Sequence, residues 1–499
     1  MAWLVYLLSA LYLTAAVWLA VYGFNSLTLT LLFLHVRRRP NPSPGAGPLP
    51  RVTVQLPIYN ERWVVRRLLE AAARLDYPRE LLQLQVLDDS VDDTRAIVDA
   101  LVERWRRRGL DISVIRRQQR RGFKAGALAN ALPLATGELI AIFDADFSPP
   151  RDWLLRVVPH FAGRPRLGFV QTRWGHLNGV YSGPTRAQVL ALDGHFIVEQ
   201  TARQRSGLLM NFNGTAGIWR RTCVENAGGW SQRTLCEDLD LSYRAQMAGW
   251  QSLYLPDVVA PAEVPPTVSS FKRQQRRWAT GSTQCLRHLA APLLRSRLRW
   301  WQKLGGLVHL SGYCGHPLLL LLLIISLPML FVDGGMRFQT AFLGVASIGP
   351  PLLYSVSQMV QGRKGTRRLV YLPLLVLLGG GLALSNTLAV LRGLSGGSGS
   401  FERTPKFRLV GAGGDWRGKS YALGFDATAL GEVALAFYAL VGAGVAWHEG
   451  RVYAVPFFGL YLLGFAYVAF EGLREGRAAR AQAKRAPTLS SQASGSPTL

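Results

Sequence analysis

Cysteine and acidic residues are both scarce in this chain. Only four cysteines occur among 499 residues, and none of them forms a C-x-x-C pair. This pattern gives no sign of a zinc knuckle or a disulfide framework, and it suits a reduced cytosolic setting for the soluble part. Internal repeats are also lacking, so the chain shows no sign of a repeat architecture.

Lys and Arg number 57 against 31 Asp and Glu, which gives a formal net charge of +26. Nucleic-acid binding is the first explanation of such a surplus. Most of the basic residues, however, lie near apolar segments, where they fit positive-inside topology and attraction to anionic lipid headgroups. The acidic residues cluster in the soluble part, where a metal ion would need them. We therefore expect membrane lipid, and no nucleic acid, among the partners.

A long apolar run precedes the soluble stretch. Residues 3–34 are nearly free of charge and form a run too long for the apolar core of a signal peptide. Arg37-Arg38-Arg39 follows it and predicts a cytosolic location for the next domain. We expect residues 1–36 to form one membrane-spanning helix, followed by a Pro/Gly-rich linker over residues 37–50.

Five further apolar runs follow the soluble stretch, and each approaches the roughly 20 residues that cross the hydrocarbon. They occupy residues 309–331, 338–360, 369–391, 428–447 and 452–471. We predict a multi-pass protein of the inner or plasma membrane, with a membrane domain over residues 306–473.

The basic loop 392–426 and the basic tail after residue 472 should both be cytosolic. Residues 369–391 are then a re-entrant or interfacial segment, not a simple span, and the Gly379-Gly380-Gly381 run suits that role. The prediction is five spans, four of them in the membrane domain, with the N-terminus outside and the C-terminus inside. Six spans is the alternative, which would put the loop 392–426 outside. Residues 474–499 are expected to be a disordered tail.

Strand and helix signals alternate between residue 51 and about residue 265. Four short apolar runs predict strands, at residues 51–56, 82–87, 112–115 and 139–143. A helix is predicted from about Asp93 to Arg108, with Asp92 and Asp93 as its N-terminal caps. This alternation predicts a wound α/β domain with a mostly parallel, Rossmann-like sheet. Ligands of such sheets bind beyond the carboxyl ends of the strands.

Acidic pairs follow two of these strands. Asp144-Ala145-Asp146 can place two carboxylates around a hard divalent cation that also holds a diphosphate. Asp88-Asp89 can accept hydrogen bonds from a nucleoside base and ribose. The alternatives are a solvated strand end for the first pair and a helix cap for the second.

Two further motifs carry charge suited to group transfer. Lys124 lies in a Gly-rich turn that enters a helix, where a cation and helix N-terminal amides would bind a diphosphate. Glu237-Asp238 begins a helix-like stretch, and Asp238 is our candidate base for an attacking hydroxyl. The alternatives are a surface lysine and a carboxylate that the helix dipole favours.

Residues 266–305 are basic and amphipathic, and they contain Gln274-x-x-Arg277-Trp278. Trp278 offers a flat face for a pyranose ring, and Arg277 can neutralise a leaving diphosphate. An interfacial membrane helix is the alternative, and the same segment can serve as both.

Together these motifs resemble the inverting family 2 glycosyltransferases of the cellulose synthase superfamily. The resemblance is strongest to the cellulose synthase-like A group of mannan and glucomannan synthases and their bacterial relatives. The residues that carry it span about half of the chain, in the family order. They are Pro57–Glu61, Val86–Ser90, Lys124–Leu128, Phe143–Phe147, Leu192–Gln200, Phe212–Gly217, Glu237–Leu241 and Gln274–Trp278.

The resemblance implies a GT-A fold over residues 51–265, placed in the cytosol between membrane helices. It also implies a nucleotide-sugar donor of the GDP-mannose or UDP-glucose class, with Mg²⁺ or Mn²⁺ as the cofactor. The implied donor-binding residues are Tyr59, Glu61, Asp89, Lys124, Asp144, Gln274 and Arg277. Asp144 and Asp146 would hold the metal, and Asp238 would be the catalytic base. The implied acceptor-binding residues are Asn213, Gly214, Thr215 and Trp278.

Phe401–Lys406 is similar to the gating loop of the superfamily, which closes over the donor through residues matching Phe401, Thr404 and Lys406. This similarity supports a cytosolic loop 392–426 and hence five spans. Two residues depart from the family pattern. Cys236 stands where relatives often have Thr, and Arg403 stands where cellulose synthases carry Val.

The resemblance predicts a membrane-embedded inverting β-glycosyltransferase that extends a β-linked polysaccharide and couples extension to export. A glycolipid synthase, which would transfer one or two sugars to a membrane lipid, is the alternative. A channel or scaffold with an inactive transferase domain is a third, minor possibility. No motif identifies the sugar of the donor.

Overall fold

The predicted strands form the parallel part of one seven-stranded sheet, with strand order β3-β2-β1-β4-β6-β5-β7. The structure is a computed structural model that describes residues 2–332, 347–396, 401–417 and 419–483. The first four strands are β1 Val52–Ile58, β2 Leu82–Asp88, β3 Asp111–Ile115 and β4 Leu139–Ile142. The last three are β5 Leu167–His176, β6 Gly217–Arg220 and β7 Gln251–Ala262. Only β6 runs antiparallel to its neighbours, so the prediction of a mostly parallel wound sheet is confirmed.

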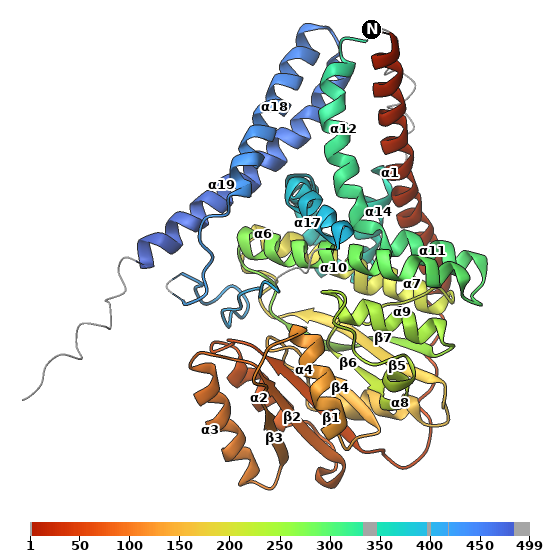
Figure 1. The fold of residues 1–499 in the computed structure, drawn as a ribbon, viewed down its shortest axis with the longest axis vertical. Coiled ribbons are helices and arrows are strands. Elements are labelled where there is room, and N and C mark those ends of the chain that lie inside the picture. The colour runs from red at the N-terminus through yellow and green to blue at the C-terminus, as the bar shows by residue number, and fades with distance from the viewer. Residues whose placement is uncertain (1, 333–346, 397–400, 418, 484–499) are drawn as a thin grey trace, which may run out of the picture.

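Helices cover both faces of this sheet, because its buried strands present apolar side chains on alternate faces. One face packs against α2 Val65–Ala73, α3 Thr94–Arg106 and α5 Trp153–Val157. The other face packs against α4 Phe123–Ala131, α8 Arg221–Asn226 and α9 Glu237–Met247. Figure 1 shows this domain beneath a group of long helices.

The predicted cap of α3 is half right. The backbone N–H of Thr94 donates to Asp92 Oδ1 at 3.0 Å, so Asp92 caps the helix. The side chain of Asp93 makes no capping bond and instead pairs with Arg62 at 2.8 Å. An ion pair with a neighbouring turn replaces the predicted cap.

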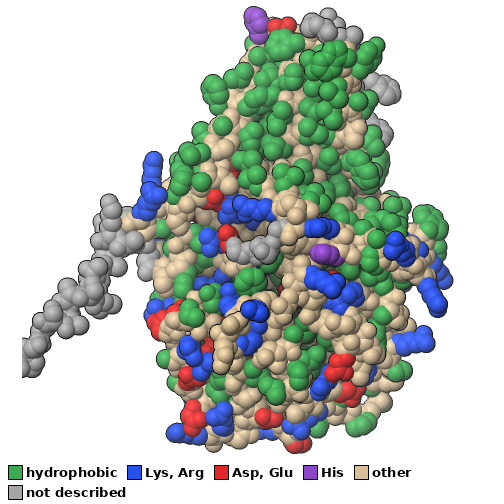
Figure 2. Space-filling model, viewed as in Figure 1, with side chains coloured by type: hydrophobic (Ala, Val, Ile, Leu, Met, Phe, Trp, Pro, Cys, Tyr) green, Lys and Arg blue, Asp and Glu red, His purple; other side chains and the backbone are tan. Residues whose placement is uncertain are grey.

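In the described part of the chain, four helices are long and apolar enough to cross a membrane. They include α1 Ala2–Val36, α12 Gly315–Met329, α18 Thr428–His448 and α19 Val455–Ala483. Figure 2 shows hydrophobic side chains over these upper helices and charged side chains gathered on the lower domain. This arrangement places the protein in association with a membrane.

The other two predicted apolar segments are not among these four helices. Of the predicted span 338–360, residues 338–346 lie outside the described residues, and the rest contains α14 Gly349–Met359. The segment 369–391 contains α16 Leu372–Gly381 and α17 Ala383–Ser395, which belong to a helix pair bent by 48°. Such a bend fits a broken span or a re-entrant loop, so the number of spans stays a prediction.

Between the sheet and the apolar helices lie α10 Val268–Arg295 and α11 Trp300–Leu310. The carboxylate of Glu475, on α19, accepts the backbone N–H groups of Val268 and Ser269 at 2.8 Å each. This contact satisfies N–H groups at the start of α10 and ties it to a C-terminal helix. Because α19 continues to Ala483, the predicted start of a disordered tail at residue 474 is wrong, and residues 484–499 lie outside the described residues.

Candidate active site

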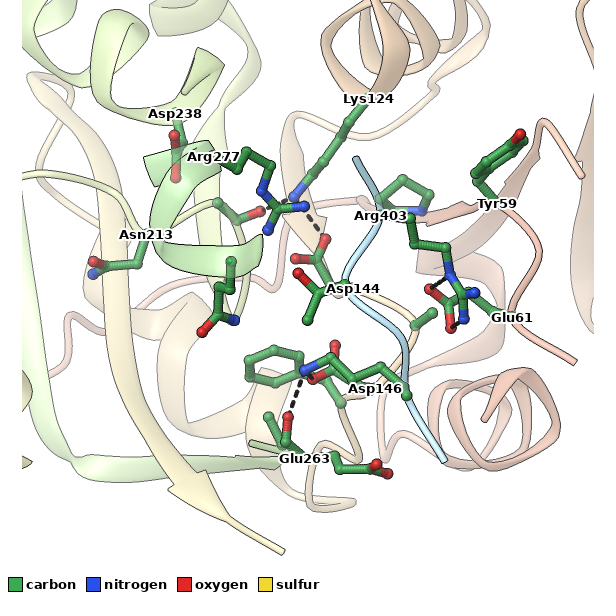
Figure 3. Close-up of a pocket in the computed structure, with 18 of the residues that line it drawn as sticks. Tyr59, Glu61, Lys124, Asp144, Asp146, Asn213, Asp238, Glu263, Arg277 and Arg403 are labelled. Atoms are coloured by element: carbon green, nitrogen blue, oxygen red, sulfur yellow. Dashed lines mark hydrogen bonds and ion pairs between the residues drawn. The ribbon is translucent and has the colours of Figure 1, made fainter. Parts of the chain in front are cut away.

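One pocket lies at the carboxyl ends of β1, β2 and β4 and brings together motifs from the whole length of the chain (Figure 3). Its walls include the following residues predicted from the sequence: Tyr59, Glu61, Asp89, Lys124, Asp144, Asp146, Asn213, Gly214, Asp238, Gln274, Arg277, Trp278, Phe401, Thr404 and Lys406. Parallel strands end at one edge of the sheet, which is why motifs distant in sequence meet there.

Thr215 is the predicted site residue that does not line this pocket. Its side chain is fully buried, and its Oγ1 accepts the backbone N–H of Asp144 at 2.9 Å. The structure therefore gives Thr215 a supporting position behind Asp144, in place of the predicted contact with an acceptor sugar.

Lys124 connects three acidic or carbonyl groups from different elements. Its Nζ donates to Asp144 Oδ1 at 2.6 Å and to the carbonyl of Gly214 at 2.8 Å, and lies 3.7 Å from Glu237 Oε1. Burial lowers the pKa of Lys124, but the nearby carboxylates outweigh burial and hold this pKa above its usual value. A permanent cation therefore stands where a diphosphate would bind.

Asp238 lies in the first turn of α9, beside Glu237. Burial and, after it, the charge of Glu237 raise the pKa of the Asp238 carboxyl, and Lys124 opposes them, so that this pKa is about 7. A carboxylate with a pKa near neutrality can accept a proton from a reacting hydroxyl and later release it. The environment of Asp238 thus suits the predicted role of a base.

The segment Phe401–Lys406 is docked in the pocket. Lys406 Nζ donates to Asp146 Oδ2 at 2.7 Å and to the carbonyl of Glu263 at 2.5 Å. The ring of Phe401 stacks on Phe123 with ring centres 5.4 Å apart. Thr404 is buried, and its hydroxyl has no partner among the described residues. The loop therefore places polar groups over the expected donor position.

Arg403, which departs from the family pattern, makes a two-point contact with Glu61. Its guanidinium donates to the two carboxylate oxygens at 2.7 and 2.6 Å. The same group lies 4.2 Å from the ring centre of Tyr421. The departure thus provides an added anchor for the loop, and the docked loop fits a gating function despite it.

The two aspartates that follow β2 have different environments. Asp88 is buried, accepts from Arg116 at 3.0 and 2.8 Å, and does not line the pocket. Asp89 lines the pocket and pairs with Arg117. Asp88 therefore stabilises the strand end, whereas Asp89 stays the candidate for a nucleoside contact.

Sequence reasoning missed two residues of this site. The carboxylate of Glu263, after β7, accepts the backbone N–H groups of Phe407 and Leu409 at 2.7 and 3.0 Å, so it holds the loop from below. The Arg120 guanidinium lies 3.4 Å from the ring centre of Tyr59. Arg120 lies in a basic run and Glu263 lies between Pro261 and Pro265. Neither residue belongs to a recognisable motif.

The paired carboxylates at the end of β4 fit a divalent cation that arrives with a diphosphate. Asp144 and Asp146 supply hard oxygen ligands, and the described residues hold no cluster of three or more His, Cys, Asp or Glu side chains able to bind metal. Mg²⁺ is commonly bound through one or two carboxylates, substrate phosphates and waters, so a site with few protein ligands suits such an ion.

Residues 50–281 match the family described as "Glycosyltransferase like family 2". This domain belongs to glycosyltransferase family 2. The domain resembles the "Probable glucomannan 4-beta-mannosyltransferase 7" of Oryza sativa subsp. japonica, with 42% identity over 249 residues, which are 49% of this chain and 43% of the relative.

A second relative is the "Glucomannan 4-beta-mannosyltransferase 2" of Arabidopsis thaliana, 40% identical over 259 residues, or 51% of this chain and 48% of the relative. The matched part thus spans about half the length of these curated relatives. Among solved structures, the mannosyltransferase PcManGT from Pyrobaculum calidifontis has a TM-score of 0.53 and 22% identity, covering 78% of this chain and 99% of that chain. This likeness agrees with the GT-A fold of the domain.

Proposed function

We propose that this protein is an inverting β-glycosyltransferase that moves a mannosyl group from a nucleotide sugar, such as GDP-mannose, onto a growing β-mannan. The observation that carries this proposal is the meeting of Asp238, Lys124 and Arg277 in one pocket (Figure 3). The two plant relatives are both named mannosyltransferases, which favours mannose over glucose.

The reaction is a single displacement. The acceptor hydroxyl gives its proton to Asp238 while its oxygen forms a bond to the anomeric carbon of the donor sugar. The bond from that carbon to the diphosphate oxygen breaks, and the nucleoside diphosphate leaves with the bonding electron pair. Attack from the opposite face inverts the anomeric configuration, so an α-linked donor gives a β-linked product.

The residues of this one pocket divide between the two reactants. Lys124 and Arg277 face the diphosphate and neutralise the charge that develops on it. Asp144 and Asp146 would hold Mg²⁺ or Mn²⁺, which adds positive charge to the same leaving group when bound. Asn213, Gly214 and Trp278 face the acceptor, and Tyr59, Glu61, Asp89 and Gln274 complete the donor side.

Export of the product is part of the proposal. Trp278, the proposed stacking platform for the acceptor sugar, lies on α10, and that helix packs directly on α17. The Thr280 hydroxyl donates to the carbonyl of Ala389 at 3.1 Å, and Ala279 packs against Ala389 and Val390. An elongating chain would therefore leave the acceptor position toward the apolar helices.

A screen of radiolabelled nucleotide sugars with protein in lipid nanodiscs tests this function. We expect incorporation from GDP-mannose into a long product that an endo-β-mannanase degrades, and no incorporation by Asp238→Asn. A chloroform-soluble product with one or two sugars would instead establish the glycolipid alternative. Absence of transfer from every donor would favour an inactive scaffold.

A further inference from the structure

A second pocket lies behind the wall of the active site, where β5 ends. Residues Trp174–His176 line both pockets. The far side of the second pocket is formed by the end of α6 Gly183–Asp193 and by Gln361 and Arg368, which follow α14. The pocket thus lies between the transferase domain and a segment that comes after the apolar helix α12.

Arg173 projects a cation into this pocket without a counter-ion. Arg173 lines the pocket, and among the residues described no hydrogen bond or ion pair reaches its guanidinium, whose Nε is buried. A partly desolvated charge without a partner is costly. Buried polar groups are nearly always satisfied, so the position of Arg173 points to an anion that the protein alone does not supply.

The one carboxylate of the pocket is already saturated. Asp193 accepts from Gln358 and Gln361 at 3.0 Å each and from Arg368 at 3.2 Å, and it lies 3.2 Å from His176 Nε2. Burial raises the pKa of Asp193, but His176, Gln361 and Gln358 outweigh burial and hold it at about 2. One carboxylate therefore faces two guanidinium groups, and the pocket keeps a net positive charge.

His176 adds a further polar atom. Its Nε2 is directed at Asp193, while its Nδ1 is buried and has no partner in the described structure. The side chain is only 10% exposed. Arg173 and His176 thus both line the pocket, and each has a buried nitrogen atom without a partner among the described residues.

The segment that supplies Gln361 and Arg368 to this pocket has the composition of a membrane interface. Large apolar side chains are exposed there, with Met359 57% exposed and Val370 73% exposed. Between them lies a basic run that contains Arg363, Lys364 and Arg367. Exposed apolar residues interleaved with Lys and Arg are typical of a segment at the level of anionic headgroups.

We propose that this second pocket binds the phosphate of an anionic phospholipid headgroup, with Arg173 and Arg368 as its cationic ligands. The acyl chains would lie along the exposed apolar residues of α14 and the segment after it. The headgroup would contact Trp174–His176, which also line the active-site pocket. A bound lipid would therefore stabilise one wall of the active-site pocket. The site is independent of the sugar and nucleotide that the enzyme uses.

Native mass spectrometry of delipidated full-length protein tests the site directly. The probe is phosphatidylglycerol, and phosphatidylcholine is the uncharged comparison. We expect one phosphatidylglycerol to bind more tightly than phosphatidylcholine, and Arg173→Gln to weaken it on the order of tenfold, as for the loss of one charge-assisted contact. The matched control is Arg367→Gln. This change removes the same charge from an exposed residue that does not line the pocket.

Equal weakening by Arg367→Gln and Arg173→Gln would overturn the proposal, since it would mean diffuse attraction to a basic surface. Full displacement of the lipid by millimolar inorganic phosphate would also overturn it, because the site would then serve a free anion. If Arg173→Gln fails to fold, Arg368→Gln provides the same measurement, since Asp193 keeps its two glutamine donors and His176. The readout is lipid binding, so it stands whether or not the proposed mannosyl transfer is correct.

Discussion

The guanidinium of Arg403 donates hydrogen bonds to both carboxylate oxygens of Glu61, a residue 342 positions earlier in the chain. Lys406 holds Asp146 from the same loop. Arg403 thus pairs with Glu61, a proposed nucleoside contact, and Lys406 pairs with Asp146, a proposed metal ligand. In the proposed binding mode, the donor and its metal ion would take over these contacts, and the loop would exchange protein partners for ligand partners.

Arg403→Gln should release the loop in the donor-free protein. Both side chains are largely buried, 12% and 11% exposed, and loss of one partner leaves the other buried and uncompensated. Cleavage of the segment 401–417 by proteinase K should accelerate by roughly tenfold. Arg408→Gln, in an exposed position of the same loop, is the control and should leave the cleavage rate unchanged. Equal rates in both variants would show that the pair does not anchor the loop.

Asp238→Asn should lower the transfer rate by roughly 10²–10⁴-fold, the range of a general base. In the unchanged enzyme, kcat/KM should rise with pH up to about 7, because Asp238 must lose its proton first. Asp152→Asn, an exposed aspartate distant from the pocket, should keep both the rate and the profile. If kcat/KM shows no change with pH near 7, Asp238 is not the catalytic base.

The same carboxyl predicts an effect on stability. Its pKa in the folded protein is raised from 3.8 to about 7, so folding favours the protonated form. The cost of ionising Asp238 therefore grows as the pH rises from about 4 to about 7 and persists above that range. At pH 8, Asp238→Asn should melt at a temperature no lower than the unchanged protein, and a clear fall in Tm would contradict this sign.

Gly214→Ala should abolish activity while leaving the fold intact. The residue has a φ of +79°, and an added Cβ would lie 2.9 Å from Asp238 Oδ2 and 3.3 Å from Lys124 Nζ. Gly163→Ala is a matched control, because its φ is +69° and nothing lies within 4 Å of an added Cβ. Both variants pay the left-handed backbone strain of about 1 kcal/mol, but only the first displaces the base. Comparable activities of the two variants would disprove this explanation.

His195→Ala should raise the KM of the acceptor by about tenfold and leave the KM of the donor unchanged. His195 Nε2 lies 2.9 Å from Asn213 Oδ1, and Asn211 donates to the same oxygen at 2.8 Å. This oxygen is therefore occupied, while the buried Asn213 Nδ2 has no partner among the described residues and is available to an acceptor hydroxyl. His288→Ala, on the exposed face of α10, is the control. A rise in the donor KM instead would indicate that His195 supports donor binding, and it would contradict this prediction.

Removal of divalent cations should stop transfer without unfolding the protein. Asp144 pairs with Lys124 at 2.6 Å and Asp146 with Lys406 at 2.7 Å, so each carboxylate has a counter-charge from the protein itself. Excess EDTA should leave Tm unchanged and abolish activity, and Mn²⁺ or Mg²⁺ should restore it. A large fall in Tm would indicate a structural metal, and persistent activity would exclude a catalytic one.

Periodicity and motif chemistry predicted the fold and most of the site from the chain alone. The strand that ends at Asp144 and the helix that begins at Glu237 are local features, because apolar runs and their polar boundaries specify them over a few residues. Motif order likewise indicated family 2. Local pattern was insufficient for Thr215, which looks like part of an acceptor motif but packs behind Asp144.

Glu263 and Arg120 could not be predicted for the same reason. Each acts on a partner distant in sequence: Glu263 holds the backbone of a loop more than a hundred residues away, as its contacts with Phe407 and Leu409 show. The end of the final helix was also missed, because Glu475 stabilises it through a contact with the start of α10. Residues 474–483 are rich in Ala and Arg, and this composition did not indicate the contact.

The sequence by itself determined which residues are candidates for the chemistry, which runs form the first strands of the sheet, and which segments are apolar enough for a membrane. These properties depend on side-chain type and short-range spacing. Only the tertiary structure decided that Arg403 pairs with Glu61, that Asp88 is withdrawn from the pocket, and that Arg173 faces a second pocket without a counter-ion. Those outcomes depend on which charges become neighbours, and that is fixed by packing across hundreds of residues.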